Sequence, residues 1–166
     1  MKKIGLTLLL LIVVLSSCST TDQNLEKNKI LVEKYVTAVE NMDTATMELL
    51  LADNYEGFGP SVNDNIDKKG AIESWKENVE NLYESIHYSK SRVIAVNVPD
   101  GENKGEWVSN WAELKIVYKK DKKEVIIWAN TIYQIEKNMI VKSYTFYNEA
   151  DVLEQLGYVF INPNNL

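Results

Sequence analysis

Two strands that fold back on each other are encoded by residues 124–147, which read EVIIWANTIYQIEKNMIVKSYTFY. Valine, isoleucine, tryptophan and tyrosine dominate both halves, a composition typical of strands. The pair Lys137-Asn138 interrupts them, and two residues are the commonest length of a hairpin connection. We therefore predict strands over 124–136 and 139–147, with Glu136 opposite Met139.

The residues before this hairpin continue the same strand-rich pattern. Residues 88–98 and 106–119 are again rich in β-branched and aromatic side chains. The turn signal Pro99-Asp100-Gly101 separates them, and the charged run 120–123 separates the second from the hairpin. These four segments predict an antiparallel meander.

Helical periodicity governs the part of the chain before the meander. Apolar side chains recur at a spacing of 3.6 residues over 25–42, and Asp43 is a predicted N-cap for a second helix over 44–52. After a short extended piece at 55–58, a third helix is predicted over 68–82. A last helix over 149–156 ends at Gly157. The sequence thus predicts an α+β domain with three N-terminal helices packed on an antiparallel sheet and a short C-terminal helix.

Charge and composition exclude several classes of function. The chain has 166 residues, with 18 Lys and Arg against 24 Asp and Glu, for a net charge of −6, and no basic cluster follows the first three residues. A nucleic-acid partner is therefore not expected, because phosphate binding needs a concentrated positive face. One cysteine and one histidine exclude a Cys/His zinc cage, and we predict neither a metal nor a cofactor.

The first eighteen residues carry a targeting signal. Lys2 and Lys3 precede an apolar run over 5–15, which is too short to span a bilayer as a helix and has the size of a signal-peptide core. The run ends in Leu15-Ser16-Ser17-Cys18, which resembles the lipobox of bacterial lipoproteins. This resemblance implies cleavage before Cys18 and acylation of its thiol, and so a lipid bilayer as partner. The protein would then be anchored on the extracytoplasmic side of the cell envelope, in the periplasm or on the cell surface.

The lipobox and the extent of the predicted helices and strands together divide the chain into four parts. Residues 1–17 are the expected signal peptide, 18–26 an acylated polar tether, 27–158 the folded domain and 159–166 a C-terminal tail.

The order of the predicted elements resembles the NTF2-like superfamily, which includes SnoaL-like polyketide cyclases and ketosteroid isomerases. Residues 32–53 look like the opening helix pair of that family, and 135–157 look like its closing hairpin and helix. The resemblance covers about residues 27–158 and implies a strongly curved sheet, a cone-like α+β barrel with an internal cavity.

The catalytic residues of these relatives are largely missing from this sequence. Tyr35 occupies the place of the isomerase tyrosine, but Gly59 stands where those enzymes have their basic aspartate. Thr131 or Ile132 stands at the second acid. Cyclases of the family carry a His-Trp-Asp run on the last strand, where this chain has Ser143-Tyr144-Thr145. Without the base, proton abstraction lacks its acceptor, so neither reaction is expected.

A candidate pocket wall follows from the hairpin register. Continuing the pairing without interruption places Ile132 opposite Ser143, Asn130 opposite Thr145 and Trp128 opposite Tyr147. The resemblance makes this the cavity face, and an even turn before residue 124 adds Trp111 and Glu113. An odd turn adds Asn110, Ala112 and Leu114 instead. The candidate binding residues are Tyr35, Trp111, Glu113, Trp128, Asn130, Ser143, Thr145 and Tyr147.

Three hypotheses about function remain open at this point. The first is a non-catalytic lipoprotein whose pocket binds a small hydrophobic ligand or a partner. The second is an enzyme of isomerase, cyclase or hydrolase type with a rearranged site, such as Tyr35 paired with Glu113. The third is a structural module that forms a homodimer through the outer face of its sheet.

Overall fold

The first described helix is longer toward the N-terminus than expected. The computed structural model describes residues 23–162 and 164, so the signal segment and Cys18 lie outside the described residues. Residues 23–40 are helical and bury a stripe that includes Val32, Tyr35 and Val39. The described end of the expected tether, residues 23–26, is therefore part of this helix. Within the described residues, no helix combines the length and the apolar character needed to span a bilayer.

Two further helices begin at aspartate N-caps. Asp43 accepts a hydrogen bond from the backbone N–H of Thr46 at 3.0 Å, which confirms the predicted cap of α2 (Thr44–Leu50). Asp67 caps α3 (Lys68–Glu77) in the same way. The chain then continues into a π-helical turn, η1 (Asn78–Leu82), so the helix predicted over 68–82 is an α-helix followed by a π turn.

Two strands interrupt the helices, and this corrects the expected block of three N-terminal helices. α2 ends at Leu50 rather than at Ala52, and β1 (Leu51–Phe58) follows immediately. β2 (Asn65–Asp67) pairs with β1 before α3 begins. The short extended piece predicted at 55–58 is the end of β1.

The remaining elements form the larger part of a six-stranded sheet. They are β3 (Tyr83–Val98), β4 (Gly105–Tyr118), β5 (Glu124–Glu136), β6 (Met139–Tyr147) and the helix α4 (Glu149–Gln155). β5 and β6 have the predicted bounds, whereas β3 starts at Tyr83 instead of Tyr88. The strand order is β2-β1-β6-β5-β4-β3, and β1 runs parallel to β6. The sheet is therefore mixed rather than wholly antiparallel, and it is curved without closing into a barrel.

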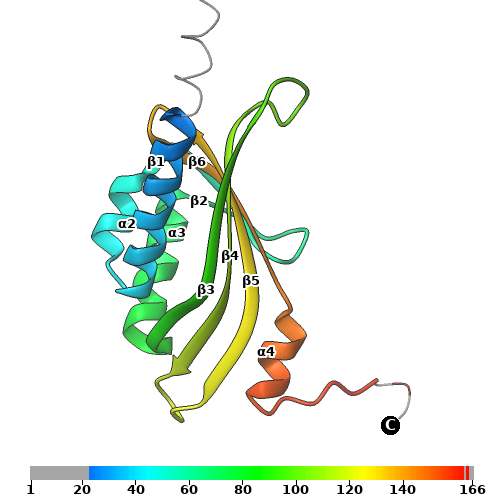
Figure 1. Cartoon of the computed structure of the whole chain (residues 1–166). Helices are drawn as coiled ribbons and strands as arrows, with labels where there is room; N and C mark the ends of the chain where they lie inside the picture. The colour runs from blue at the N-terminus through cyan, green and yellow to red at the C-terminus, as the bar shows by residue number, and fades with distance from the viewer. Residues whose placement is uncertain (1–22, 163, 165–166) are drawn as a thin grey trace, which may run out of the picture.

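The core lies between the helices and one face of this sheet. The helix over 23–40, α2 and α3 lie side by side along that face, and α4 lies at the far end of the sheet from residue 23 (Figure 1). Met47, Leu51 and Ile140 are fully buried between the layers. The bend of the sheet leaves a space beside this core that its side chains do not fill.

Candidate functional site

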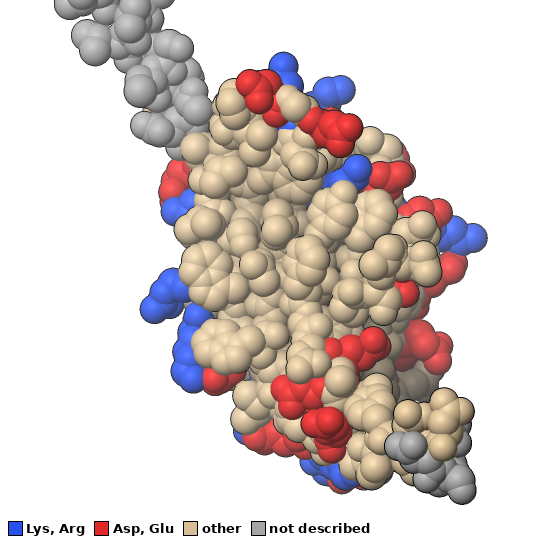
Figure 2. Space-filling model, turned by 90° about the vertical axis from the view of Figure 1, so that its right-hand side faces the viewer, with Lys and Arg blue, Asp and Glu red and all other residues tan. Residues whose placement is uncertain are grey.

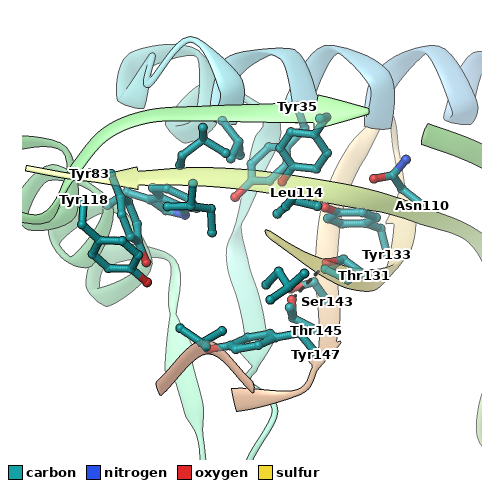
Figure 3. A pocket seen from close by; sticks show the side chains of 18 of the residues that line it. Tyr35, Tyr83, Asn110, Leu114, Tyr118, Thr131, Tyr133, Ser143, Thr145 and Tyr147 are labelled. Atoms are coloured by element: carbon teal, nitrogen blue, oxygen red, sulfur yellow. Dashed lines mark hydrogen bonds between the residues drawn. The ribbon is translucent and has the colours of Figure 1, made fainter. Parts of the chain in front are cut away.

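A cavity of about 250 Å³ lies between the helices and the inner face of the sheet (Figure 3). Its wall comes from the helix over 23–40, α3, α4 and five of the strands. The lining residues are Tyr35, Val39, Tyr55, Trp75, Tyr83, Ile86, Tyr88, Asn110, Leu114, Ile116, Tyr118, Ile127, Ala129, Thr131, Tyr133, Ser143, Thr145, Tyr147 and Val152. This volume is slightly below the roughly 300–1,000 Å³ usual for sites of drug-sized ligands, so the cavity suits a small molecule.

The register of the last hairpin differs from the prediction by one residue. The turn at Lys137-Asn138 has positive φ at both residues and pairs Glu136 with Met139, as predicted. Val141 is then an extra residue, because Ile135 pairs with Ile140 and Gln134 pairs with Lys142. This β-bulge shifts every later pair, so Tyr133 lies opposite Ser143 and Thr131 opposite Thr145.

Because of this bulge, four of the eight predicted binding residues do not line the cavity. The turn between β4 and β5 has an even number of residues, which is the first of the two options considered. It pairs Trp111 with Asn130 and Glu113 with Trp128. Because of the bulge, this set of four belongs to the outer face of the sheet and is absent from the cavity wall. Asn110 and Leu114, two of the three residues of the odd-turn option, line the cavity together with Tyr35, Ser143, Thr145 and Tyr147, whereas Ala112 does not.

Buried phenols dominate the deep end of the cavity. The hydroxyls of Tyr55 and Ser143 share a 2.7 Å hydrogen bond, and both side chains are almost inaccessible from outside. Tyr35 and Tyr133 pack edge to face with ring centroids 5.8 Å apart. Burial is the main cause that raises the pKa of Tyr35, Tyr55 and Tyr133 above 10, so all three are neutral at pH 7.

The other end of the cavity is less enclosed. Tyr83, Tyr118, Tyr147 and Val152 of α4 are only partly buried there, and we call them the mouth residues. Tyr83 and Tyr118 meet edge to face at 5.6 Å. Burial raises the pKa of Tyr83 to about 12, with smaller contributions from Tyr118 and Tyr147.

The cavity wall provides hydrogen-bonding groups without an acid or base that works near neutral pH. Seven tyrosines, two threonines, one serine and one asparagine line it, and no described Asp, Glu, His, Lys or Arg does so. A neutral phenol donates or accepts a hydrogen bond and stacks on an apolar ring, but it does not take up a proton. The geometry therefore suits recognition of a neutral, largely apolar molecule with polar substituents.

Glu113, a candidate from the sequence, and His87, the one histidine of the chain, are engaged elsewhere. Glu113 accepts a 2.6 Å hydrogen bond from Lys90 on the outer face, and this contact holds the pKa of its carboxyl below the usual range. The same Lys90 ammonium lies 5.5 Å from the ring centroid of Trp128. His87 contacts Glu40 at 2.5 Å. Within the described residues, no cluster of three or more His, Cys, Asp or Glu side chains has a metal-binding arrangement.

Most tyrosines of the cavity wall were not among the candidates from the sequence, namely Tyr55, Tyr83, Tyr88, Tyr118 and Tyr133. Tyr83 and Tyr88 lie where the prediction placed a loop and a strand start, so their position on the cavity wall could not be assigned. Two lysines of the connection between β4 and β5 hold both sides of the mouth. Lys119 donates 2.7 Å hydrogen bonds to the carbonyls of Val79 and Glu80 in η1, and Lys123 donates to the carbonyl of Leu156 after α4. No signal in the sequence pairs these lysines with those carbonyls.

Comparison with known proteins identifies the fold. No protein-family model and no curated protein matches the sequence. Among solved structures, a protein proposed to be a polyketide cyclase, from Xanthomonas campestris pv. campestris, superposes with a TM-score of 0.67 at 12% identity, over 81% of this chain and 99% of that one.

Two other structures agree with this match. An LEH-like epoxide hydrolase from M. tuberculosis has a TM-score of 0.63 at 14% identity, over 80% of this chain and 91% of its own. An NTF2-like protein from Burkholderia xenovorans LB400 has a TM-score of 0.62 at 12% identity, over 79% and 96%. At these identities the comparison establishes the fold, and proteins with different activities share it.

Proposed function

From an NTF2-like fold with a phenol-lined cavity, we propose that this chain is a binding protein rather than a catalyst, with a small, neutral, largely hydrophobic molecule as its ligand. The observation that supports this most directly is the set of seven cavity tyrosines, with no carboxylate, imidazole or amine side chain among the lining residues that the structure describes. Acid–base catalysis needs a group whose pKa lies near the working pH, and burial moves these phenols away from it.

We also propose that the protein is a bacterial lipoprotein, held through acylated Cys18 on the extracytoplasmic side of a membrane. The support is the segment Leu15-Ser16-Ser17-Cys18 after an apolar run. Replacing the thiol by Cys18→Ala should abolish fatty-acid labelling and leave uncleaved precursor. Equal labelling of the variant would show that acylation occurs elsewhere.

The pocket proposal is tested by filling the cavity from one strand while leaving the opposite face unchanged. Ala129 lines the cavity, whereas its neighbour Trp128 is exposed on the outer face. With 4-propylphenol as probe and calorimetry as readout, Ala129→Leu should abolish binding and Trp128→Phe should leave it unaltered. Binding that survives in a folded Ala129→Leu variant would place the ligand elsewhere.

Tyr35→Phe provides a finer test of the same cavity. It removes one hydroxyl and keeps the ring, so we expect a loss of roughly tenfold in affinity for the probe, since a hydrogen bond contributes about 1–3 kcal/mol. The melting temperature should hardly change. Unaltered affinity, or lost stability instead, would assign the hydroxyl a structural role.

The outer face of the sheet supports a second candidate function, association with another copy of the chain. Figure 2 shows a broad face without charged side chains at its centre and with charges along its border. The exposed apolar residues that contribute to it are Ile94, Val96, Ile126, Trp128 and Phe146. A homodimer through this face should dissociate in a Trp128→Lys variant, measured by sedimentation, while probe binding to the cavity persists.

The enzymatic alternative finds less support in the arrangement of the site. The structural neighbours include an epoxide hydrolase and a proposed polyketide cyclase, so the fold is compatible with catalysis. The pair suggested by the sequence is not brought together, because Tyr35 faces the cavity and Glu113 lies on the outer face.

A further inference from the structure

The side chain of Asn110 is the one amide among the described residues of the cavity wall, and its burial makes its orientation informative. It is 4% exposed and lies in β4 near the deep tyrosines (Figure 3). A buried amide normally satisfies both its N–H groups and its oxygen. The direction of each end of the amide therefore indicates which hydrogen-bonding group a ligand in the cavity must carry.

The nitrogen end of Asn110 is held by strand β3. Its Nδ2 donates to Ser91 Oγ at 2.7 Å and to the backbone carbonyl of Arg92 at 3.4 Å. The carbonyl can only accept, so this contact fixes the amide against a flip. Ser91 and Arg92 belong to the irregular stretch of β3 between Ser89 and Arg92, where the register against β4 shifts. The bulge thus brings two acceptors to the same amide nitrogen.

The oxygen end of Asn110 is left facing the cavity. Its Oδ1 accepts no hydrogen bond from another described group. Among the described residues, every side-chain nitrogen or oxygen that is inaccessible to solvent does have a hydrogen-bond partner. The oxygen must therefore open onto accessible space, and in Figure 3 it points toward the tyrosines of the wall, away from the nitrogen. It is an acceptor that cannot become a donor without breaking both contacts to β3.

We infer that Asn110 is the specificity-determining acceptor of the cavity and selects a ligand that carries a hydroxyl or N–H donor on an apolar ring or chain. This inference rests on the proposed binding function and names the ligand class for the same site. The phenols around it adapt, because a hydroxyl rotates between donating and accepting. The amide oxygen does not adapt, and a ligand without a donor would leave it buried without a partner.

A matched pair of probes tests the inference on the full-length chain. 4-Propylanisole carries O–CH3 where 4-propylphenol carries O–H, so it lacks the donor and is larger by one methyl group, and Asn110→Leu controls for that difference in size. We expect the wild type to bind the phenol at least about tenfold more tightly, and Asn110→Leu to bind both probes about equally. Ser91→Ala, which removes one of the two anchors of the amide and leaves β4 intact, should reduce the preference without abolishing it. All variants are measured in the same detergent, so that partitioning of the probes cancels.

The possible outcomes separate the inference from the proposed function. Equal binding of the two probes by the wild type, or a preference that persists unchanged in both variants, overturns the role of Asn110 and leaves the pocket intact. Absence of binding for both probes in the wild type contradicts the pocket proposal itself, and the inference with it. A preference lost in Asn110→Leu and weakened in Ser91→Ala supports both.

Discussion

The inner and outer faces of β4, β5 and β6 are built from alternate residues of the same strands, and both are rich in aromatic rings. On the inner face the rings are mainly tyrosines, buried against the helices and free of charged neighbours on the cavity wall. On the outer face Trp111 and Trp128 lie beside the ion pair of Lys90 and Glu113. The two faces differ in solvent access and polar partners rather than in aromatic content. An aromatic pattern alone therefore does not show which face forms a site.

Alkaline pH should destabilise the protein through the buried phenols of the inner face, and we expect this effect to be the largest. Burial raises the pKa of the cavity tyrosines above the ordinary value of 10, to about 12 for Tyr83. Above about pH 10 the unfolded chain loses phenol protons that the folded chain retains, so the free energy of unfolding falls as pH rises. Urea denaturation between pH 8 and about 12 measures this fall, and tyrosinate absorbance should increase together with unfolding. Full ionisation of the phenols in a folded protein would contradict their burial.

Two adjacent isoleucines of β5 allow a direct comparison of the faces. Ile127 is 5% exposed and packs in the core, whereas Ile126 is 45% exposed on the outer face. Ile127→Ala should reduce the free energy of unfolding by about 2–5 kcal/mol, because it leaves a cavity in the packed layer. Ile126→Ala should cost less than about 1 kcal/mol. Chemical denaturation of the two variants decides the point, and equal losses would mean that a partner covers the outer face.

A polar contact within the inner face gives a smaller effect. Tyr55→Phe removes the hydroxyl that shares a 2.7 Å hydrogen bond with Ser143 and leaves the serine oxygen buried without that partner. We expect a loss of about 1–3 kcal/mol in stability. Tyr35→Phe is the comparison variant, because its hydroxyl interacts with the indole of Trp75 rather than with a buried hydroxyl, and its melting temperature should stay closer to that of the wild type.

The smallest effect is expected for the ion pair of the outer face. Glu113→Gln removes a charge that contacts Lys90 in a position open to solvent and salt. Thermal denaturation at low and at high ionic strength should show little difference from the wild type, and probe binding should be unaltered. A large loss of probe binding would mean that Glu113 faces the cavity, which would contradict its position on the outer face.

Local signals in the sequence were sufficient for most of the elements. The Asp43 cap, the Lys137-Asn138 turn and the bounds of β5 and β6 were predicted because each depends on residues close together in the chain. The extra residue at Val141 was not predicted, because Ile140 and Val141 are both apolar and buried, so the sequence does not show which of them interrupts the alternation of the strand. Because this extra residue was missed, Trp128 and Asn130 were predicted on the cavity face of the sheet instead of its outer face.

Contacts between segments far apart in the chain could not be predicted from the sequence. The parallel pairing of β1 with β6 joins residues about ninety positions apart, and nothing in either segment specifies its neighbour. The same holds for Lys119 and Lys123, whose roles at the mouth depend on where η1 and α4 come to lie. Such contacts follow from the assembled fold, so Tyr118 and Tyr133 could be predicted as strand residues but not as residues of the site.

The early start of the first helix has a consequence for how the domain would stand on a membrane. From Cys18 to residue 23 the chain advances only five residues, a contour of at most about 18 Å. If Cys18 carries the lipid, the domain is held close to the bilayer by the end where this helix begins, while α4 and the mouth residues lie at the other end (Figure 1). The cavity would then face the aqueous compartment, so its ligand would arrive dissolved in water rather than by diffusion within the lipid.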